Sequence, residues 1–277
     1  MIKLYDFNLN FDGDDKSSVQ ANNLALAKFN FIFDGKKIDA PSCAITSVKL
    51  GNMNYDFPDT NTARLNVFDR LNIRSYTVFS CKQNHSRNVV VIRPQTLPYY
   101  VEADGLITDS KTLSLAVTVA DCLPVYLFDT GSGAFSVLHS GWKGTGIVHN
   151  ALQQLKNKFA AKPKNVAAIL GPCIQSCCYE VDKERADQFN EEFGNSQLKR
   201  QIEKKYYPLG SVVKIRNDND TQKYFIDMQA ANAHLLVKDG VQNIAYCKDC
   251  TFMNTNLGSY RREGAGFTKM MALIGHL

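Results

Sequence analysis

The chain has 277 residues, a formal net charge of +5, 44% hydrophobic residues and 21% charged residues. This length can bury a large core, and it favours one α/β domain, with or without an N-terminal elaboration, over two independent domains. The basic residues are scattered and form neither a dense stripe nor a known module, which argues against a nucleic-acid partner. The small positive excess is compatible with an anionic ligand such as phosphate.

No segment predicts export or membrane insertion. The first residues contain no apolar stretch of signal-peptide length. The most apolar run, at 113–128, is short for a membrane span and contains Asp121. We therefore expect a cytoplasmic protein with no membrane partner, whose eight cysteines are thiols or metal ligands rather than disulfides.

The predicted elements alternate after an N-terminal stretch of about forty residues that has no clear periodicity. Within that stretch, 21–29 predicts a short helix. In chain order we then expect a helix (63–71), strands (76–81, 88–92, 113–119, 124–128 and 134–138), a helix (147–159), a strand (166–170), a helix (183–193), a strand (223–226), a helix (228–238) and strands (243–246 and 270–274). This alternation predicts a layered α/β domain in which helices cover a sheet.

Three candidate metal ligands lie at predicted strand ends. His85 lies in a predicted turn, Cys122 follows Asp121 at a break between two apolar strands, and His139 lies where a strand gives way to a glycine-containing loop. Side chains at such positions can converge from separate segments. Thiolate and imidazole are favoured zinc ligands, and three protein ligands leave a fourth position for water or substrate. Asp121, or another nearby carboxylate, is the expected outer-shell partner or proton carrier.

Each of these residues also has a simpler interpretation. A cysteine in an apolar strand region is usually a small buried hydrophobic residue. A lone histidine is more often hydrogen-bonded than metal-bound, and the ligand spacing is much longer than that of a zinc finger. The residues alone therefore leave the triad as the less favoured interpretation.

Other cysteines form two weaker patterns. Cys247 and Cys250 are a C-x-x-C pair, which is either a redox dithiol or two unrelated buried thiols. Cys173, Cys177 and Cys178 resemble a metal loop, but their spacing differs from that of the zinc nucleoside deaminases, and no H-x-E precedes them.

Three further residues are candidates for binding a ligand. Trp142 either forms a wall of a pocket or packs in the interior. Arg261 and Arg262 can clamp a phosphate bidentately, or they can simply be solvated at the surface.

Several motifs occur in an order that resembles the laccase-domain, or polyphenol oxidase, family. The match covers roughly residues 75 to 265, and it rests on Gln83-x-His85, Ala103-Asp104-Gly105-Leu106-Ile107-Thr108, Ala120-Asp121-Cys122-Leu123-Pro124-Val125, His139-Ser140-Gly141-Trp142-Lys143-Gly144, Gly171-Pro172-Cys173-Ile174, Cys177-Cys178-Tyr179-Glu180-Val181 and Ser259-Tyr260-Arg261-Arg262.

The resemblance implies that His85, Cys122 and His139 bind zinc, with copper possible at the same site. It implies an α/β sandwich similar to the cysteine-hydrolase-like fold of a deamidating toxin. It also implies a purine nucleoside phosphorylase that acts on adenosine, inosine and methylthioadenosine, with adenosine deaminase activity. On this hypothesis the catalytic residues are Cys122, His139 and Asp121, and the substrate-binding residues are Lys143, Trp142, Tyr260, Arg261 and Arg262.

The chain departs from the family at several places. Lys143 stands where the family usually has arginine, and Gly266-Phe267-Thr268-Lys269 stands near the place of a family Gly-Arg. Residues 1–60 match poorly, so we divide the chain into an N-terminal segment (1–60), packed on the main domain, and a zinc enzyme domain (61–277). These departures affect the expected substrate choice and rate more than the metal site.

Three alternative functions stay open. The first is a hydrolase or amidase, acting on a cell-wall precursor, with Cys122 as nucleophile and His139 as base. The second is a copper oxidoreductase. The chain has five histidines and no H-x-H pair, which makes it a poor match to a multicopper enzyme. The third is a metal-binding protein with weak turnover.

Overall fold

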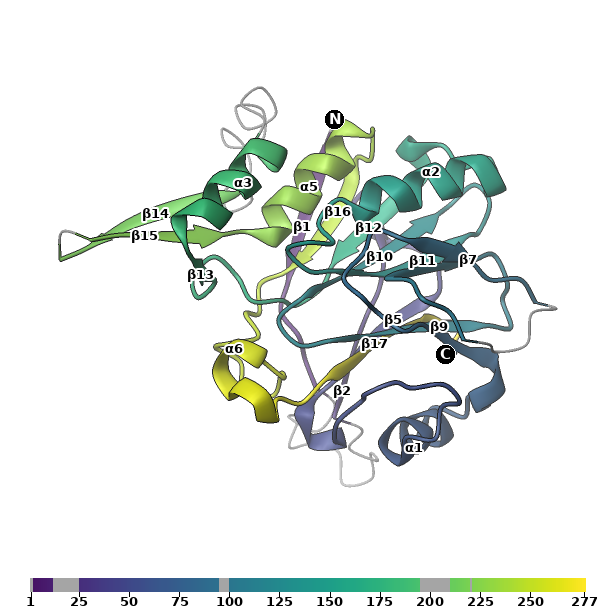
Figure 1. The fold of residues 1–277 in the computed structure, drawn as a ribbon. Coiled ribbons are helices and arrows are strands. Elements are labelled where there is room, and N and C mark those ends of the chain that lie inside the picture. Colours follow the sequence, from purple (N-terminus) through teal and green to yellow (C-terminus); the bar gives the residue numbers. More distant parts are fainter. Residues whose placement is uncertain (1, 12–24, 95–99, 195–209, 220) are drawn as a thin grey trace.

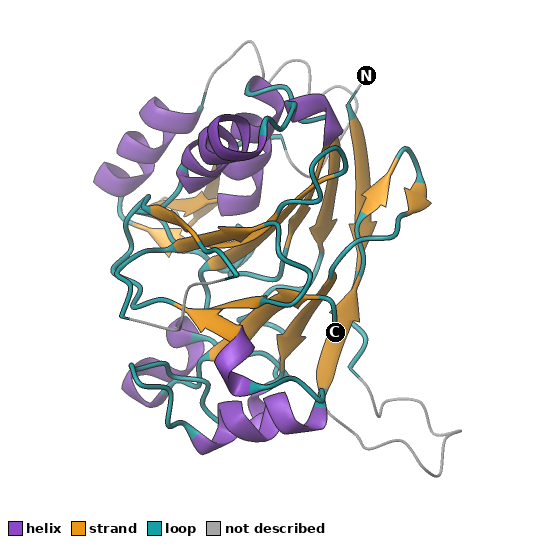
Figure 2. Cartoon of the chain, turned by 90° about the vertical axis from the view of Figure 1, so that its right-hand side faces the viewer, coloured by secondary structure: helices purple, strands orange, loops and turns teal. Residues whose placement is uncertain are grey.

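Two β-sheets stack face to face at the centre of the molecule, and helices cover both outer surfaces (Figure 2). The computed structural model describes residues 2–11, 25–94, 100–194, 210–219 and 221–277. This mixed α/β domain agrees with the layered fold expected from the sequence. The likeness to a deamidating toxin stays a prediction.

The larger sheet is mixed and has seven strands. Its strands pair in parallel at both edges and antiparallel in the centre. In spatial order they are β1 (Lys3–Phe7), β16 (Asn243–Cys247), β12 (Val166–Leu170), β10 (Leu123–Asp129), β11 (Phe135–Ser140), β8 (Gly105–Thr108) and β7 (Val89–Val91).

The second sheet has five strands, and only its β6–β9 pair is parallel. In spatial order they are β2 (Leu26–Phe29), β5 (Ser42–Thr46), β17 (Met270–Gly275), β9 (Ser114–Val119) and β6 (Val78–Ser80). A three-stranded sheet of β13 (Glu180–Val181), β15 (Thr221–Ile226) and β14 (Val213–Asp218) and a hairpin of β3 (Ile32–Phe33) and β4 (Lys36–Lys37) complete the described strands.

The helices lie on the two outer surfaces (Figure 1). The larger sheet is covered by α2 (Ile147–Phe159) and α5 (Met228–Lys238), and the second sheet by α1 (Thr62–Arg70). Helix α3 (Lys183–Phe193) packs against α5 and the three-stranded sheet. A short helix, α6 (Tyr260–Glu263), precedes β17, and 3-10 turns occur at Val48–Leu50, Ser75–Thr77, Pro163–Asn165 and Gly264–Gly266. No helix in the described part of the chain has both the length and the apolarity needed to cross a bilayer.

Strand β10 shows why the central apolar run forms a strand. Val125 and Leu127 lie in the hydrophobic cluster under α2 and α5, whereas Tyr126 and Phe128 lie in the cluster between the two sheets. Both faces of the strand are therefore buried, and a strand buried on both faces has a continuous rather than an alternating apolar pattern.

The helix predicted at 21–29 is wrong where the structure describes it. Leu26–Phe29 is strand β2, which pairs antiparallel with β5, and the residues before Ala25 lie outside the described part of the chain. Leu26, Ala27 and Phe29 are buried and Lys28 is exposed, so the side chains alternate as in a strand. Pairing with β5, in which Leu26 lies opposite Thr46 and Phe29 opposite Cys43, overrides the local helical preference of this segment.

Strands from the first sixty residues lie in both sheets. Strand β1 pairs with β16 at the edge of the larger sheet, and β2 and β5 extend the second sheet beyond β17. The division of the chain at residue 60 stays a prediction.

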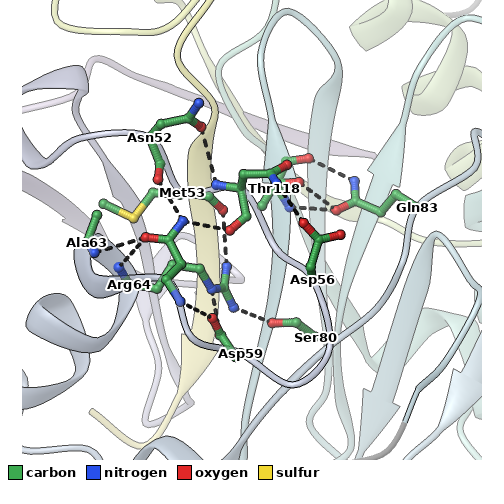
Figure 3. Close-up of polar contacts among 11 residues, drawn as sticks. Asn52, Met53, Asp56, Asp59, Ala63, Arg64, Ser80, Gln83 and Thr118 are labelled. Atoms are coloured by element: carbon green, nitrogen blue, oxygen red, sulfur yellow. Dashed lines mark hydrogen bonds and ion pairs between the residues drawn. The ribbon is translucent and has the colours of Figure 1, made fainter.

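A fully buried arginine joins α1 to its surroundings (Figure 3). The Arg64 guanidinium donates from Nε to Asp59 Oδ2 at 2.7 Å and from Nη2 to Ser80 Oγ at 2.6 Å. It also donates to the carbonyl of Met53 at 3.4 Å, and it lies over the rings of Tyr55 and Phe68. One side chain thus connects the 51–61 loop, α1 and the end of β6.

Candidate metal centre and pocket

The three predicted metal ligands converge in the folded chain. One ligand atom each of His85, Cys122 and His139 lies within 4.8 Å of the others. His85 follows β6, Cys122 lies where the chain passes from β9 to β10, and His139 belongs to β11. The cluster therefore lies at the junction of the two sheets and draws on segments from both.

The carboxylate that contacts this cluster is Asp104, which directly precedes β8. His139 Nδ1 lies 2.7 Å from Asp104 Oδ1, and both side chains are buried. A carboxylate accepts hydrogen bonds, so Nδ1–H donates, and in the neutral ring the other nitrogen, Nε2, keeps the lone pair that a metal ion would use. Asp104 belongs to one of the motifs shared with the family. From the sequence, Asp121 or another nearby carboxylate was expected as the partner, and Asp104 was not singled out.

The same carboxylate holds the loop that carries His85. Asp104 accepts hydrogen bonds from the backbone N–H groups of His85, at 3.1 Å, and Ser86, at 2.6 Å, and from the Ser86 hydroxyl at 2.7 Å. His85 has a φ of 61°, in the left-handed region that is costly for residues other than glycine. Asp104 thus fixes the strained backbone at one histidine and the ring of the other.

Gly141 leaves the space in which the three ligands meet. A methyl group at this position would lie 3.0 Å from Cys122 Sγ and 3.1 Å from His85 Cδ2. Such approaches are tighter than ordinary van der Waals contacts, so any larger residue would displace a ligand. The requirement at Gly141 is space, because its φ is not in the left-handed region.

Without a metal ion, the cysteine and the buried histidine form a polar pair. Burial opposes ionisation of the Cys122 thiol, but His139 and His85 outweigh it and lower its pKa to about 6. Burial likewise lowers the pKa of His139, but Cys122 and Asp104 outweigh it and raise the pKa to about 9. The thiolate, which is the form that binds metals, is therefore the stable form at neutral pH.

Asp121, the carboxylate expected to be an outer-shell partner or proton carrier, is hydrogen-bonded to the C-terminal segment, and its catalytic role stays a prediction. Its carboxylate accepts from Thr251 Oγ1 at 2.6 Å and from the backbone N–H of Arg261 at 2.7 Å. Both partners lie in the segment that leads into α6 or within α6 itself. Asp121 thus attaches this C-terminal segment to the β9–β10 turn, beside Cys122.

A pocket of about 480 Å³ opens over the cluster. Of the residues predicted to bind substrate, Trp142, Tyr260 and Arg261 line it, and so do all three candidate ligands and Asp121. Gln83 lines it as well, and its side-chain amide exchanges hydrogen bonds of 2.8 Å with the backbone N–H and carbonyl of Thr118 (Figure 3).

Two predicted substrate-binding residues are not among those that line the pocket. Lys143 is exposed, and its Nζ lies 5.6 Å from the centre of the Trp142 ring. Arg262 donates to the carbonyls of Thr251, at 2.6 Å, and Phe252, at 2.9 Å, and to Glu263. The Arg262 guanidinium therefore ties the 251–257 segment to α6.

Several pocket residues were not singled out by the sequence, among them two cationic residues and a tyrosine. Arg185 of α3 lies 4.5 Å over the Trp142 ring, Tyr179 lies under Arg261 at 5.4 Å, and Lys269 donates to Asn54 Oδ1 at 2.8 Å. Tyr179 and Lys269 stood within segments compared with the family, but Arg185 lies on a helix whose composition gives no signal of a site. The pocket therefore combines aromatic surfaces with cationic groups.

The cluster fits a zinc ion by the chemistry of its donors. One thiolate and two imidazoles are preferred zinc ligands, and a carboxylate on the far nitrogen of a histidine is the usual outer-shell arrangement. Three ligands from the protein, at the base of a pocket, leave one position for a ligand from the pocket side.

Fold and site together define a layered α/β protein with a Cys-His-His cluster in an aromatic and cationic pocket. Residues 41–276 match the model of the family described as multi-copper polyphenol oxidoreductase laccase. The chain belongs to this family.

Curated relatives agree with this assignment, and a solved structure agrees with the fold. A Clostridium acetobutylicum protein named a purine nucleoside phosphorylase is 26% identical over 227 residues, which are 80% of this chain and 86% of the relative. A protein named an adenosine deaminase, from an unknown prokaryotic organism, is 29% identical over 73% of this chain and 76% of its own length. The crystal structure of YlmD from Geobacillus stearothermophilus has a TM-score of 0.71 and 24% identity over 89% of this chain and 96% of that chain, and it supports the fold.

Proposed function

We propose that this protein is a zinc-dependent purine nucleoside phosphorylase that acts on adenosine, inosine and methylthioadenosine, with adenosine deamination as a second activity. The observation that carries the proposal is the convergence of His85, Cys122 and His139 beneath a pocket with both aromatic and cationic walls. The names of the relatives supply the substrate class. The location in the cytoplasm stays a prediction.

The pocket residues divide by their chemistry. Trp142, Tyr179 and Tyr260 offer aromatic surfaces on which a purine can stack. Arg185, Arg261 and Lys269 are the cationic groups that would bind phosphate, since arginine suits bidentate contact with phosphate oxygens. Lys143 and Arg262 would act indirectly, through Trp142 and α6.

In phosphorolysis, a phosphate oxygen attacks the ribose C1′ while the bond from C1′ to the purine nitrogen breaks and the base leaves with the electron pair. The cationic side chains hold the phosphate, and the aromatic side chains fix the base. Asp104 keeps His139 in the tautomer that directs Nε2 towards the cluster. When bound, zinc supplies a Lewis acid and, for deamination, lowers the pKa of a bound water.

The test is the Cys122→Ala variant. We expect it to lose one equivalent of bound zinc, measured by metal analysis, together with nucleoside turnover, measured by chromatography of adenosine with and without phosphate. Adenine formed only with phosphate reports phosphorolysis, inosine reports deamination, and hypoxanthine reports both. Cys43→Ala, which removes another buried thiol, is the matched control. Full activity in Cys122→Ala would refute the proposal.

A specific observation favours one alternative, a cysteine hydrolase or amidase. Without metal, Cys122 and His139 have the arrangement of a nucleophile and its base, oriented by the Asp104 carboxylate: the pKa of the thiol is lowered to about 6 and that of His139 is raised to about 9, so the proton passes from sulfur to imidazole. Chelator sensitivity supports the zinc enzyme. Activity that survives chelation and is lost when iodoacetamide labels Cys122 supports the hydrolase.

The remaining alternatives concern the metal and the rate. Copper binds nitrogen and sulfur ligands more tightly than zinc, so a copper oxidoreductase with one ion at the same ligands is the second candidate. A metal-binding protein with weak turnover is the third. Metal analysis after purification without added metal separates zinc from copper, and bound zinc without any product from nucleosides would support the third.

A further inference from the structure

A second group of potential metal ligands lies outside the candidate active site. Cys177 and Cys178 belong to the turn that follows β12, and Cys250 follows β16. One sulfur atom of each lies within 4.8 Å of the others. The sequence showed these residues as members of two unrelated patterns, a loop of cysteines and a C-x-x-C pair. The fold joins parts of both patterns.

The spacing of the sulfur atoms suits one shared ion. Zinc–sulfur bonds of about 2.3 Å place the sulfurs of a three-coordinate ion about 4 Å apart. Cys177 Sγ and Cys178 Sγ are 3.4 Å apart, and no pair exceeds 4.8 Å, so small side-chain rotations bring all three to bonding distance. All three are free thiols.

The backbone of both segments is held in place around the sulfurs. The isolated bridge between Cys173 and Cys250 joins the segments, and Thr251 N–H donates to the Cys173 carbonyl at 3.0 Å. Gln175 N–H donates to Cys250 Sγ at 3.4 Å. The sulfurs are therefore arranged by the fold, as metal ligands must be if binding is to be strong.

Charge and access also favour a cation bound by thiolates. Arg216 of β14 donates to the carbonyls of Ser176, at 2.8 Å, and Cys177, at 3.1 Å, which places a positive group beside the cluster. Three thiolates carry more negative charge than a single cation neutralises, and the guanidinium offsets part of the remainder. Cys177 is exposed and Cys250 is buried, so an ion can enter from solvent and bind inside.

We propose that Cys177, Cys178 and Cys250 form a second metal site, for a thiophilic cation such as Cu(I) or Zn²⁺. Soft thiolate ligands select these ions, and three sulfurs suit a three-coordinate Cu(I) or a Zn²⁺ that takes a further ligand from solvent. The site does not depend on the proposed enzymatic function.

The position of this site connects it to the pocket. Tyr179, next to Cys178, lines the pocket, and Thr251, next to Cys250, donates to Asp121 at 2.6 Å. A bound ion would fix the two segments to each other directly behind the pocket wall. Its role would then be to hold Tyr179 and the segment before α6 in place.

The test counts metal ions in fully reduced protein under anaerobic conditions. Cd²⁺ is the spectroscopic probe, because thiolate-to-cadmium charge transfer absorbs in the ultraviolet, and Cu(I) is titrated separately against a chromophoric chelator. We expect wild type to bind two equivalents of Cd²⁺ and Cys177→Ser to bind one, with most of the ultraviolet band lost. Cys122→Ser should also bind one but keep most of the band. Cys43→Ala is the control and should match wild type.

Cys177 is exposed, so its substitution should not impair folding, and Cys250→Ser repeats the test from the other segment. Equal cadmium binding and an equal band in wild type and Cys177→Ser would overturn the proposal. A disulfide between Cys250 and Cys177 or Cys178 in protein alkylated at the moment of cell lysis would also overturn it, in favour of a redox pair. Loss of turnover in Cys122→Ser alone bears only on the proposed function.

Discussion

At the scale of single residues, Asp104 is hydrogen-bonded to both segments that carry the histidines of the candidate metal centre. It accepts a hydrogen bond from His139 Nδ1 and four from the 84–86 loop that carries His85. His139 lowers the pKa of Asp104, despite burial, so the carboxylate is ionised. A buried carboxylate that fixes two ligands at once is a positioning residue for the whole centre.

Asp104→Asn should weaken zinc binding by about 10- to 100-fold. The amide can donate to His139 Nδ1, which would place the ring proton on Nε2, the atom that must bind the metal. Competition with a chromophoric chelator measures the affinity. Asp109→Asn, at an exposed carboxylate paired with Arg93, is the control. Affinity within about twofold of wild type would show that Asp104 does not set the tautomer.

At the scale of elements, α6 depends on Asp121 for its place beside the pocket. The helix is only one turn long, and Asp121 accepts from the backbone N–H of Arg261 within it. Arg262 and Glu263 add hydrogen bonds to the flanking segments. The pocket residues Tyr260 and Arg261 are thus positioned by a side chain from the turn between the sheets.

Asp121→Asn distinguishes positioning from proton transfer. An asparagine cannot accept from both Thr251 and Arg261 with the same geometry, so α6 should shift. We expect KM for phosphate to rise about tenfold, which corresponds to one lost hydrogen bond, with kcat and zinc content nearly unchanged. A fall in kcat of about 100-fold or more at constant KM would instead identify Asp121 as the proton carrier. Steady-state kinetics with metal analysis decides between the two.

The packing of helix α1 depends in the same way on one side chain, the buried Arg64. Its guanidinium is paired with Asp59 and hydrogen-bonded to Ser80. Arg64→Ala should lower the free energy of unfolding by about 3 kcal/mol, because it leaves a cavity and an unpaired carboxylate. Arg70→Ala, on the exposed side of the same helix, should change it by less than about 0.5 kcal/mol. Urea unfolding measures both, and equal effects would contradict this account of the Arg64 network.

At the scale of the whole molecule, the candidate metal centre lies between the two sheets. Cys122 lies where the chain crosses from β9 in one sheet to β10 in the other, His139 lies on β11 of the larger sheet, and His85 follows β6 of the second sheet. An ion bound here would hold both layers together. A metal ion that binds the folded chain but not the unfolded chain would therefore stabilise the entire domain.

Zinc should raise the melting temperature. With free zinc at 100 times Kd, binding adds about 2.7 kcal/mol, which corresponds to roughly 5–11 °C for a domain of this size. The measurement uses Cys177→Ser protein, so that only the His85, Cys122 and His139 centre responds, and compares it with the double variant that also carries Cys122→Ala. An equal rise in both proteins would place the stabilising ion elsewhere.

The sequence alone predicted the elements whose burial is continuous or strongly periodic. The helices at 183–193 and 228–238 and the strands around 124–128 and 166–170 are confirmed, because their apolar pattern reports burial directly. The helix predicted at 21–29 was wrong where the structure describes it, and strands β1 and β5 were not predicted. These strands are stabilised by pairing with β16 and β17, more than two hundred residues away in the sequence, which local preferences do not encode.

The candidate site divides in the same way. The residues His85, Cys122 and His139 follow from sequence through a family resemblance, since their own chemistry favoured simpler roles. Their convergence, the contact of Asp104 with His139, and the meeting of Cys250 with Cys177 and Cys178 were decided by the tertiary structure. The reason is physical: a residue's type sets which bonds it can form, but only the packing of distant strands sets which partners come within the few ångströms at which those bonds exist.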